Sequence, residues 1–225
     1  RMKFLCNYLG DEFSDNIKSG CDNTSEKKLT PIEDYQLKEK LKEFHETYFP
    51  TIRCVQRYNN IIDGVAASYY GVSNVGATIH RCKYENGGDF PDFLLVQTLR
   101  AYRKKFGNKH IDFVMFVPPS ISGTLVENFA KKIAQILDIP FSYAVEKIKE
   151  TEPQKRFHNS YLKRDNVKDS FTINNTDVTD KTILLIDDIY DTGATLKEIG
   201  KVLTKSGATE IIPLVIAKTV GRDND

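Results

Sequence analysis

Two adjacent carboxylates near the C-terminal end of the chain are the residues best suited to chemistry. Asp187 and Asp188 follow the apolar run 183–186, which predicts a buried strand because it shows no alternation of apolar and polar residues. A loop of small and hydroxyl-bearing residues, 191–195, comes next, and a helical pattern begins at Leu196. Backbone amides at such a loop suit a phosphate, and paired carboxylates accept hydrogen bonds from paired sugar hydroxyls. The segment therefore predicts a site for a phosphorylated sugar.

The elements that must position these acids alternate between apolar strands and amphipathic helices. Strand patterns occupy 113–117, 183–186 and 211–216, and helical faces occupy 93–106, 126–137 and 196–203. The stretch 69–82 is typical either of paired strands or of a strand followed by a helix. This alternation predicts an α/β fold with a mostly parallel sheet flanked by helices. In such sheets ligands bind beyond the carboxyl ends of the strands, where the acidic pair lies.

The first 50 residues follow a different pattern. Apolar residues with helical spacing end at Gly10, and a polar stretch separates them from a second helix. Thr30 is expected to cap that helix, which should stop before Pro50. We therefore expect a small helical appendage over 1–50 and an α/β domain over 51–225.

Composition is that of an ordinary globular chain with one full domain and an appendage. The chain has 225 residues, of which 40% are apolar and 28% are charged. Its net charge of +1 creates no global field that would attract nucleic acid. No apolar run approaches the roughly 20 residues of a membrane span, and no secretory signal opens the sequence. Four cysteines without a CxxC pair are expected to be free thiols of a cytoplasmic protein. The start at Arg1 rather than Met indicates a fragment.

The acidic segment closely resembles the phosphoribosyl diphosphate (PRPP) signature of type I phosphoribosyltransferases. That signature has four apolar residues, two acids, two apolar residues and a Thr/Gly loop, and residues 183–195 fit it throughout. The resemblance implies that Asp187 and Asp188 hold the ribose 2- and 3-hydroxyls and that the loop holds the 5-phosphate. It makes Asp191 the candidate for handling charge or a proton near the sugar ring. The implied substrate contacts of the loop are Tyr190, Thr192, Gly193, Ala194 and Thr195. The alternative is an ordinary strand–loop–helix turn with an Asp cap.

Three further segments resemble one branch of these enzymes, the ComF-like and amidophosphoribosyltransferase-like proteins. Segment 69–84 is similar to the early strand and the lysine-aromatic element of that branch, and 151–171 is similar to its mobile segment. Val117-Pro118 is similar to its diphosphate-loop entry. The loop that follows departs from the branch, because residues 119–129 include no basic residue.

The uncharged loop leaves open how a diphosphate would be held. Its own candidate contacts are Pro118, Ser120, Ser122 and Gly123, of which the two serines and the glycine offer backbone amides and hydroxyls. Mg²⁺ or a basic segment elsewhere would supply positive charge. Lys155, Arg156 and Arg164 are the candidate cations, in a segment that the resemblance implies is a flexible hood over the diphosphate. A solvated charged hairpin is the alternative for this segment, because acidic residues alternate with the basic ones.

Residues 1–24 resemble the zinc-binding module of RecQ helicases. Only Cys21 falls on a cysteine of that module, and a closed zinc site normally needs four ligands, so we expect no zinc in this fragment. The resemblance implies that the chain is the C-terminal part of a RecQ-like DNA helicase. It thereby implies a link to DNA repair and recombination, with DNA a partner of the full-length protein.

The resemblances together imply a Mg²⁺-dependent phosphoribosyltransferase. It would bind PRPP or a related nucleotide and transfer phosphoribose to a nitrogen acceptor, with Asp187 and Asp188 as indirect Mg²⁺ ligands. Two other classes stay open: a non-catalytic module that senses PRPP or a nucleotide, and a DNA-binding accessory module of a helicase. A homodimer is an expectation by resemblance only, and no membrane partner is expected.

Overall fold

The computed structural model of the chain describes residues 34–54, 60–71, 74–85, 88–119, 123–149 and 166–220, without the side chain of His45. The chain divides into two compact units, Arg1–Glu46 and Thr47–Asp225. Predictions for residues 1–33, including the first helix, the cap at Thr30 and the zinc-module remnant around Cys21, lie outside the described residues. The division into an appendage and a domain near residue 50 stays a prediction.

Helix α2 spans Tyr35–Thr47 and ends before Pro50, where the sequence predicted a stop. Among the described residues, the Asp34 carboxylate accepts a hydrogen bond from the Leu37 amide at 3.0 Å and so caps the first turn. The large apolar side chains of the helix are about half exposed or more.

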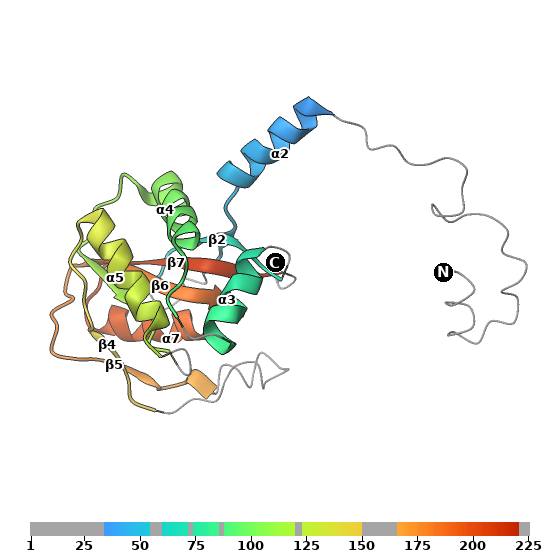
Figure 1. Cartoon of the computed structure of the whole chain (residues 1–225). Coiled ribbons are helices and arrows are strands. Elements are labelled where there is room, and N and C mark those ends of the chain that lie inside the picture. Colours follow the sequence, from blue (N-terminus) through green and yellow to red (C-terminus); the bar gives the residue numbers. More distant parts are fainter. Residues whose placement is uncertain are drawn as a thin grey trace, which may run out of the picture. The chain divides into compact units, whose positions relative to one another are not determined.

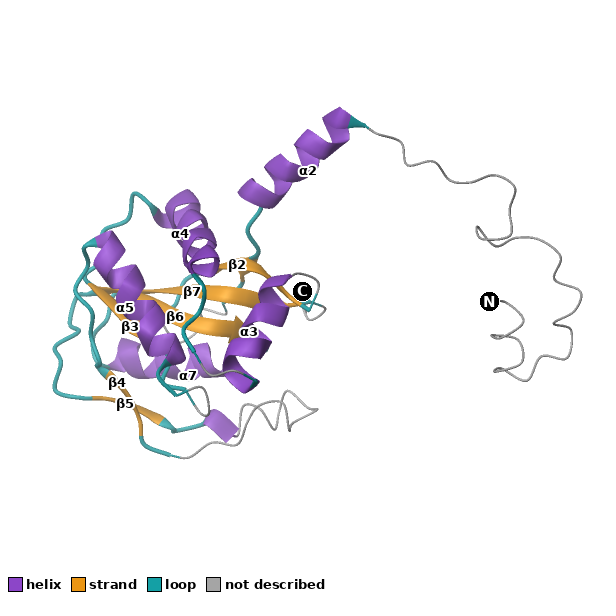
Figure 2. Cartoon of the chain, in the orientation of Figure 1, coloured by secondary structure: helices purple, strands orange, loops and turns teal. Residues whose placement is uncertain are grey.

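A five-stranded sheet forms the centre of the second unit, in the order β1-β2-β7-β6-β3 (Figure 2). Its strands are β1 (Thr51–Ile52), β2 (Gly64–Tyr70), β3 (Phe113–Phe116), β6 (Thr182–Tyr190) and β7 (Glu210–Thr219). The short edge strand β1 pairs antiparallel with β2, and every other pair is parallel. The predicted α/β fold with a mostly parallel sheet flanked by helices is confirmed.

Helices cover both faces of this sheet (Figure 1). On one face lie α3 (Asn74–Tyr84), α4 (Asp92–Phe106) and α5 (Leu125–Leu137), and on the other lie α7 (Ala194–Lys205) and a small antiparallel sheet of β4 (Val145–Lys147) and β5 (Phe171–Ile173). Leu184 and Ile186 of β6 pack into the core under α3, α4 and α5, whereas Ile183 and Leu185 pack into the core under α7. This burial on both faces explains why the strand is apolar throughout.

The structure decides one open alternative and adds three short strands, β1, β4 and β5. Residues 69–82 form the end of β2 and most of α3, so they are a strand followed by a helix rather than paired strands. Strands β4 and β5 have only three residues each, too few to show a period in the sequence. No helix in the described ranges is long and apolar enough to cross a membrane.

Candidate functional site

The acidic pair lies at the carboxyl edge of the sheet, beside the loop that follows β3. Phe116 is paired with Ile186, and the Val117 amide donates to the Ile186 carbonyl oxygen at 2.9 Å. The loop that begins with Pro118 therefore leaves β3 next to Asp187. Strand β6 itself continues to Tyr190, because its pairing with β7 extends that far. The sequence predicted that the strand would end at the acids, whereas it extends through residues 187–190.

The two acids make different contacts. The Asp188 side chain is buried, and its Oδ2 accepts a hydrogen bond from Nζ of Lys83 at 2.6 Å. Lys83 lies in the last turn of α3, more than a hundred residues earlier in the sequence. Oδ1 of Asp187 accepts a hydrogen bond from the Asp188 amide at 2.8 Å. The structure therefore places one lysine and two carboxyl groups in a single cluster.

The charges of this cluster change the proton affinities of its members. Desolvation, followed by the nearby charge of Asp188, raises the pKa of Asp187 to about 8, while the Asp188 amide and Lys83 act in the opposite direction. Burial tends to lower the pKa of Lys83, but the charge of Asp188 and its hydrogen bond outweigh burial and raise this pKa. Near neutral pH the ligand-free site therefore holds a protonated Asp187 beside a charged Lys83.

The loop after β6 has a backbone shape that only glycine fits easily. Gly193 has a φ of 71°, and a Cβ atom there would lie 2.8 Å from the hydroxyl oxygen of Tyr190. Tyr190 is held in turn, because its hydroxyl donates to the Arg53 carbonyl oxygen at 3.2 Å. The Asp191 carboxylate accepts a hydrogen bond from the Thr219 hydroxyl at the end of β7, at 3.2 Å. These contacts fix both sides of the loop.

The loop leads directly into the N-terminus of α7, which begins at Ala194, two residues before the predicted start. No side chain caps the helix there, and α7 has no acidic residue in its first turn. The hydroxyl oxygen of Thr192 is buried and has no hydrogen-bond partner among the described residues. A buried hydroxyl without a partner is costly, so its presence beside an uncapped helix start indicates a site built for an anionic ligand.

The other predicted contacts are only partly described. Pro118 is half-buried at the end of β3, and Gly123 is exposed with a φ of 53° and no atom near the position of a Cβ. Ser120, Ser122, Lys155, Arg156 and Arg164 lie outside the described residues. The structure therefore brings together the acids and the loop at 191–195, and the predicted cations stay a prediction.

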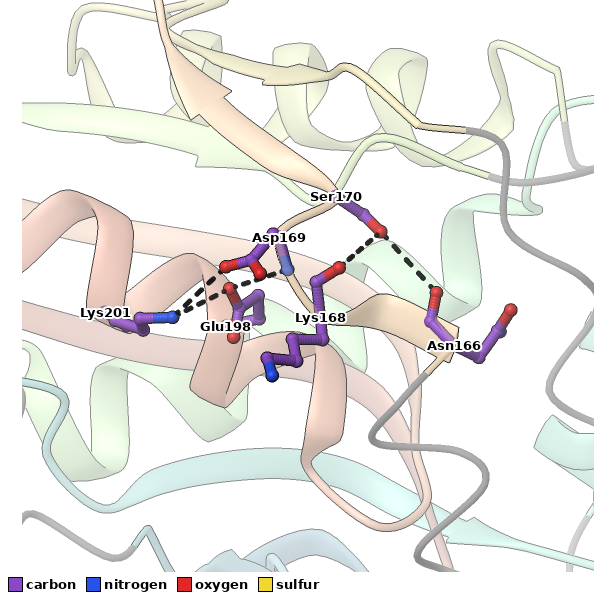
Figure 3. A network of polar contacts seen from close by, with 6 residues as sticks. All are labelled: Asn166, Lys168, Asp169, Ser170, Glu198 and Lys201. Atoms are coloured by element: carbon purple, nitrogen blue, oxygen red, sulfur yellow. Dashed lines mark hydrogen bonds and ion pairs between the residues drawn. The ribbon is translucent and has the colours of Figure 1, made fainter.

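The segment that carries these cations is flanked by described structure. Strands β4 and β5 pair on either side of it, and the Ile148 amide donates to the Ser170 carbonyl oxygen at 2.9 Å. The Asp169 amide donates to the Glu198 carboxylate of α7 at 3.1 Å, and Lys201 lies within 3.5 Å of both carboxylates (Figure 3). The described residues on either side of 150–165 are thus joined to each other, and Asp169 joins them to α7.

Lys83 is a site residue that the candidate set did not include. Its position before an aromatic residue was part of the resemblance over 69–84, but nothing in the sequence links it to an acid so far away along the chain. Only the packing of α3 against the sheet shows this proximity.

The donor set fits a Mg²⁺ ion that arrives with a substrate. Within the described ranges, no three His, Cys, Asp or Glu side chains are grouped to hold a metal. Mg²⁺ is commonly held by one or two carboxylates together with substrate phosphates, and Asp187 and Asp188 supply the carboxylates.

One family model and several solved structures match this chain. A family model described as the phosphoribosyl transferase domain matches residues 100–223. No curated protein matches the sequence. Among solved structures, the allosteric regulatory enzyme of purine biosynthesis is 23% identical with a TM-score of 0.37, covering 54% of this chain and 24% of its own. The glutamine PRPP amidotransferase of B. subtilis is 23% identical with a TM-score of 0.35, covering 47% of this chain and 22% of its own.

A purine phosphoribosyltransferase of Pyrococcus horikoshii is 20% identical with a TM-score of 0.38, covering 59% of this chain and 87% of its own. The chain spans only about a quarter of the length of the first two enzymes. Because the TM-scores are low, the assignment rests on the family model, which covers more than half of the sequence and includes the acidic pair and its loop. The chain belongs to the phosphoribosyl transferase domain family.

Proposed function

We propose that the chain is a Mg²⁺-dependent phosphoribosyltransferase domain that binds PRPP and transfers its phosphoribose to a nitrogen acceptor. The observation that carries this proposal is the junction of β6 and α7. There two acids, a glycine with positive φ and a buried hydroxyl that has no partner among the described residues precede a helix start without a side-chain cap.

The loop at 191–195 is proposed to hold the 5-phosphate. A phosphate would accept hydrogen bonds from the Thr192 hydroxyl and from backbone amides at the start of α7. Gly193 lets the backbone approach the ligand closely, because it has no Cβ and adopts a positive φ. The positive end of the α7 dipole adds to this attraction.

The acids are proposed to hold the ribose. Asp187 and Asp188 would accept hydrogen bonds from the 2- and 3-hydroxyls, and the bound diol would orient C1 toward the acceptor. Departure of diphosphate from C1 creates positive charge on the ring, as in glycoside cleavage. Asp191, which Thr219 holds near the loop, would place negative charge close to that ring. Asp187 would lose its proton when Mg²⁺ brings positive charge to the cluster, because a nearby cation favours the charged form of a carboxyl group.

The diphosphate must be neutralised and kept from water. Mg²⁺, held indirectly through Asp187 and Asp188, would supply positive charge to the leaving group when it is bound. Ser120, Ser122 and Gly123 would offer backbone and hydroxyl donors, and Pro118, which has no N–H, would contact the diphosphate at the start of the loop. Lys155, Arg156 and Arg164 would reach the diphosphate from the segment between β4 and β5, and closure of that segment would exclude water.

The finer assignments belong to the same proposal. The ComF-like subtype is supported by the strand, helix and lysine-aromatic pattern over 69–84. Attachment to a RecQ-like helicase, with DNA as a partner of the whole protein and a role in DNA repair and recombination, is supported by the resemblance over 1–24. The tyrosines and the helix at 69–84 adjoin the carboxyl edge of the sheet, where the acceptor would enter.

A second candidate function is a module that senses PRPP or a nucleotide without turnover. It is favoured by the loop after β3, because residues 119–129 include no basic side chain to neutralise a leaving diphosphate. The two functions share the ribose 5-phosphate site and differ in whether diphosphate is released.

Calorimetric titration with PRPP and Mg²⁺ tests the proposal, and a diphosphate-release assay with nucleobases or ammonia separates its two forms. Asp187→Asn should weaken PRPP binding at least about tenfold, because a carboxylate that binds the diol is lost. Asp138→Asn is the matched control, since Asp138 is exposed at the far end of α5 and Asn also tolerates its positive φ. Absence of PRPP binding by the unaltered chain would refute both functions.

A further inference from the structure

Helix α3 brings a buried cation into the proposed ribose site from outside the residues that the family model matches. Nζ of Lys83 lies 2.6 Å from Oδ2 of Asp188, and the two side chains are only 15% and 8% exposed. The family match begins at residue 100, whereas α3 ends at Tyr84. The lysine therefore lies outside the part of the chain that the family model matches.

Stability alone does not account for a lysine at this position. Taking an ammonium out of water is costly, and a buried ion pair is often no better for folding than apolar side chains of similar size. Lys83 forms its ion pair with Asp188, the second acid of the signature, and with no other carboxylate among the described residues. A charge placed at such a cost beside a ligand site indicates a role in binding.

The chemistry of the substrate puts a second anionic group near this lysine. The diphosphate of PRPP is attached to C1, next to the carbon that bears the 2-hydroxyl. A cation in contact with the carboxylate that binds the diol is therefore within a side-chain rotation of the diphosphate oxygens. The ammonium has three donors, and the described contacts direct one of them to Asp188.

The loop after β3 lacks the positive charge that binding of a diphosphate requires. Residues 119–129 follow the neighbouring strand at the same edge of the sheet and include no lysine or arginine. A diphosphate bound between this loop and the acids would meet no positive side chain from the loop. Lys83 approaches from α3, on the face of the sheet that also carries α5, the helix that this loop enters.

We propose that Lys83 is a diphosphate-binding cation of this site, in addition to the cations proposed for the segment between β4 and β5. Without a ligand it pairs with Asp188, and when a ribose hydroxyl takes over that carboxylate, the ammonium turns to the diphosphate. This inference rests on the proposed function, because it assumes that the acids bind the ribose of PRPP.

The test compares two ligands that share ribose and the 5-phosphate but differ in the diphosphate. The 225-residue chain is titrated with PRPP and with ribose 5-phosphate, each in the presence of Mg²⁺. The unaltered protein is compared with the variants Lys83→Met and Lys83→Arg. Lys83→Met should weaken PRPP binding about ten- to a hundredfold more than ribose 5-phosphate binding, and Lys83→Arg should restore most of the difference. Lys132→Met, which removes a surface lysine paired with Asp89, should change neither affinity.

Three results have distinct meanings. Equal losses for the two ligands would show that Lys83 acts only by holding Asp188, which overturns the inference and leaves the proposed function intact. No loss for either ligand would also overturn it. Failure of the unaltered chain to bind either ligand would refute the proposed function itself.

Lys83→Met leaves a buried carboxylate without its partner and is at risk of unfolding. An NMR titration of the unaltered chain avoids this problem and also detects ligands that bind weakly. With lysine labelled at ¹³Cε, the Lys83 signal is identified by its absence in Lys83→Arg. A larger shift of this signal with PRPP than with ribose 5-phosphate is expected, and equal shifts or none would overturn the inference.

Discussion

Two loops at neighbouring strands of the sheet differ in the surroundings of their glycines, Gly193 and Gly123. Both follow a parallel strand and lead into a helix without a side-chain cap, α7 in one case and α5 in the other. In the β6–α7 loop, a Cβ on Gly193 would collide with Tyr190, whereas a Cβ on Gly123 in the β3–α5 loop would meet no atom of the described residues within 4 Å. The first loop also has a buried hydroxyl without a partner.

The difference shows where binding is built in. The shape of the β6–α7 loop is set by packing around Gly193, so a phosphate that binds there as proposed would require little further ordering. The β3–α5 loop has neither a basic residue nor a close packing contact at its glycine. A ligand at this loop would therefore be held largely by groups from elsewhere, and the structure describes the partly buried Lys83 in contact with Asp188.

The largest effect on stability and binding is expected when a methyl group is added at the glycine of the β6–α7 loop. Gly193→Ala combines a positive φ with a collision against the Tyr190 hydroxyl, so it should lower the free energy of unfolding by about 2–4 kcal/mol and abolish ribose 5-phosphate binding. Gly123→Ala has the positive φ alone and should cost about 1–2 kcal/mol. Denaturant unfolding and calorimetry measure both. Equal costs at the two glycines would contradict the difference between the loops.

A pH dependence of stability is expected from Asp187. Its pKa in the folded chain is about 8, well above the roughly 4 of an unfolded Asp, so the folded state binds this proton more tightly. The resulting stabilisation is complete below about pH 4 and is lost as the pH rises toward 8. The free energy of unfolding should therefore fall by up to about 1.4 kcal/mol per pH unit from this group. Asp187→Asn should flatten this slope, and an unchanged slope would count against a raised pKa of Asp187 beside Asp188.

A smaller effect is expected from the buried hydroxyl. Thr192→Val removes a hydroxyl that has no partner, so the stability of the ligand-free chain should stay the same or rise by up to about 1 kcal/mol. Binding of ribose 5-phosphate should weaken about tenfold, because a hydrogen bond to a charged phosphate is lost. Thr124→Val in the β3–α5 loop is the matched control and should leave ribose 5-phosphate binding unchanged. A loss of stability in Thr192→Val would show that the hydroxyl serves folding instead.

The sequence predicted the sheet core and the acidic pair because both depend on local patterns. The continuous apolar run before Asp187 and the helical face at 93–106 are confirmed as β6 and α4. The extension of β6 to Tyr190 was not predictable, because pairing with β7 decides it. The contact between Lys83 and Asp188 was missed for the same reason: it joins a helix and a strand that are distant in the sequence.

The central claim is that the β6–α7 loop binds a pentose 5-phosphate beside Asp187 and Asp188. Backbone amide chemical shifts of the isotopically labelled chain, recorded during titration with PRPP and Mg²⁺, test it most directly. The largest changes are expected at residues 187–195, with saturation at the calorimetric affinity. Changes that spare these residues while others respond, or no changes at all, would contradict the claim.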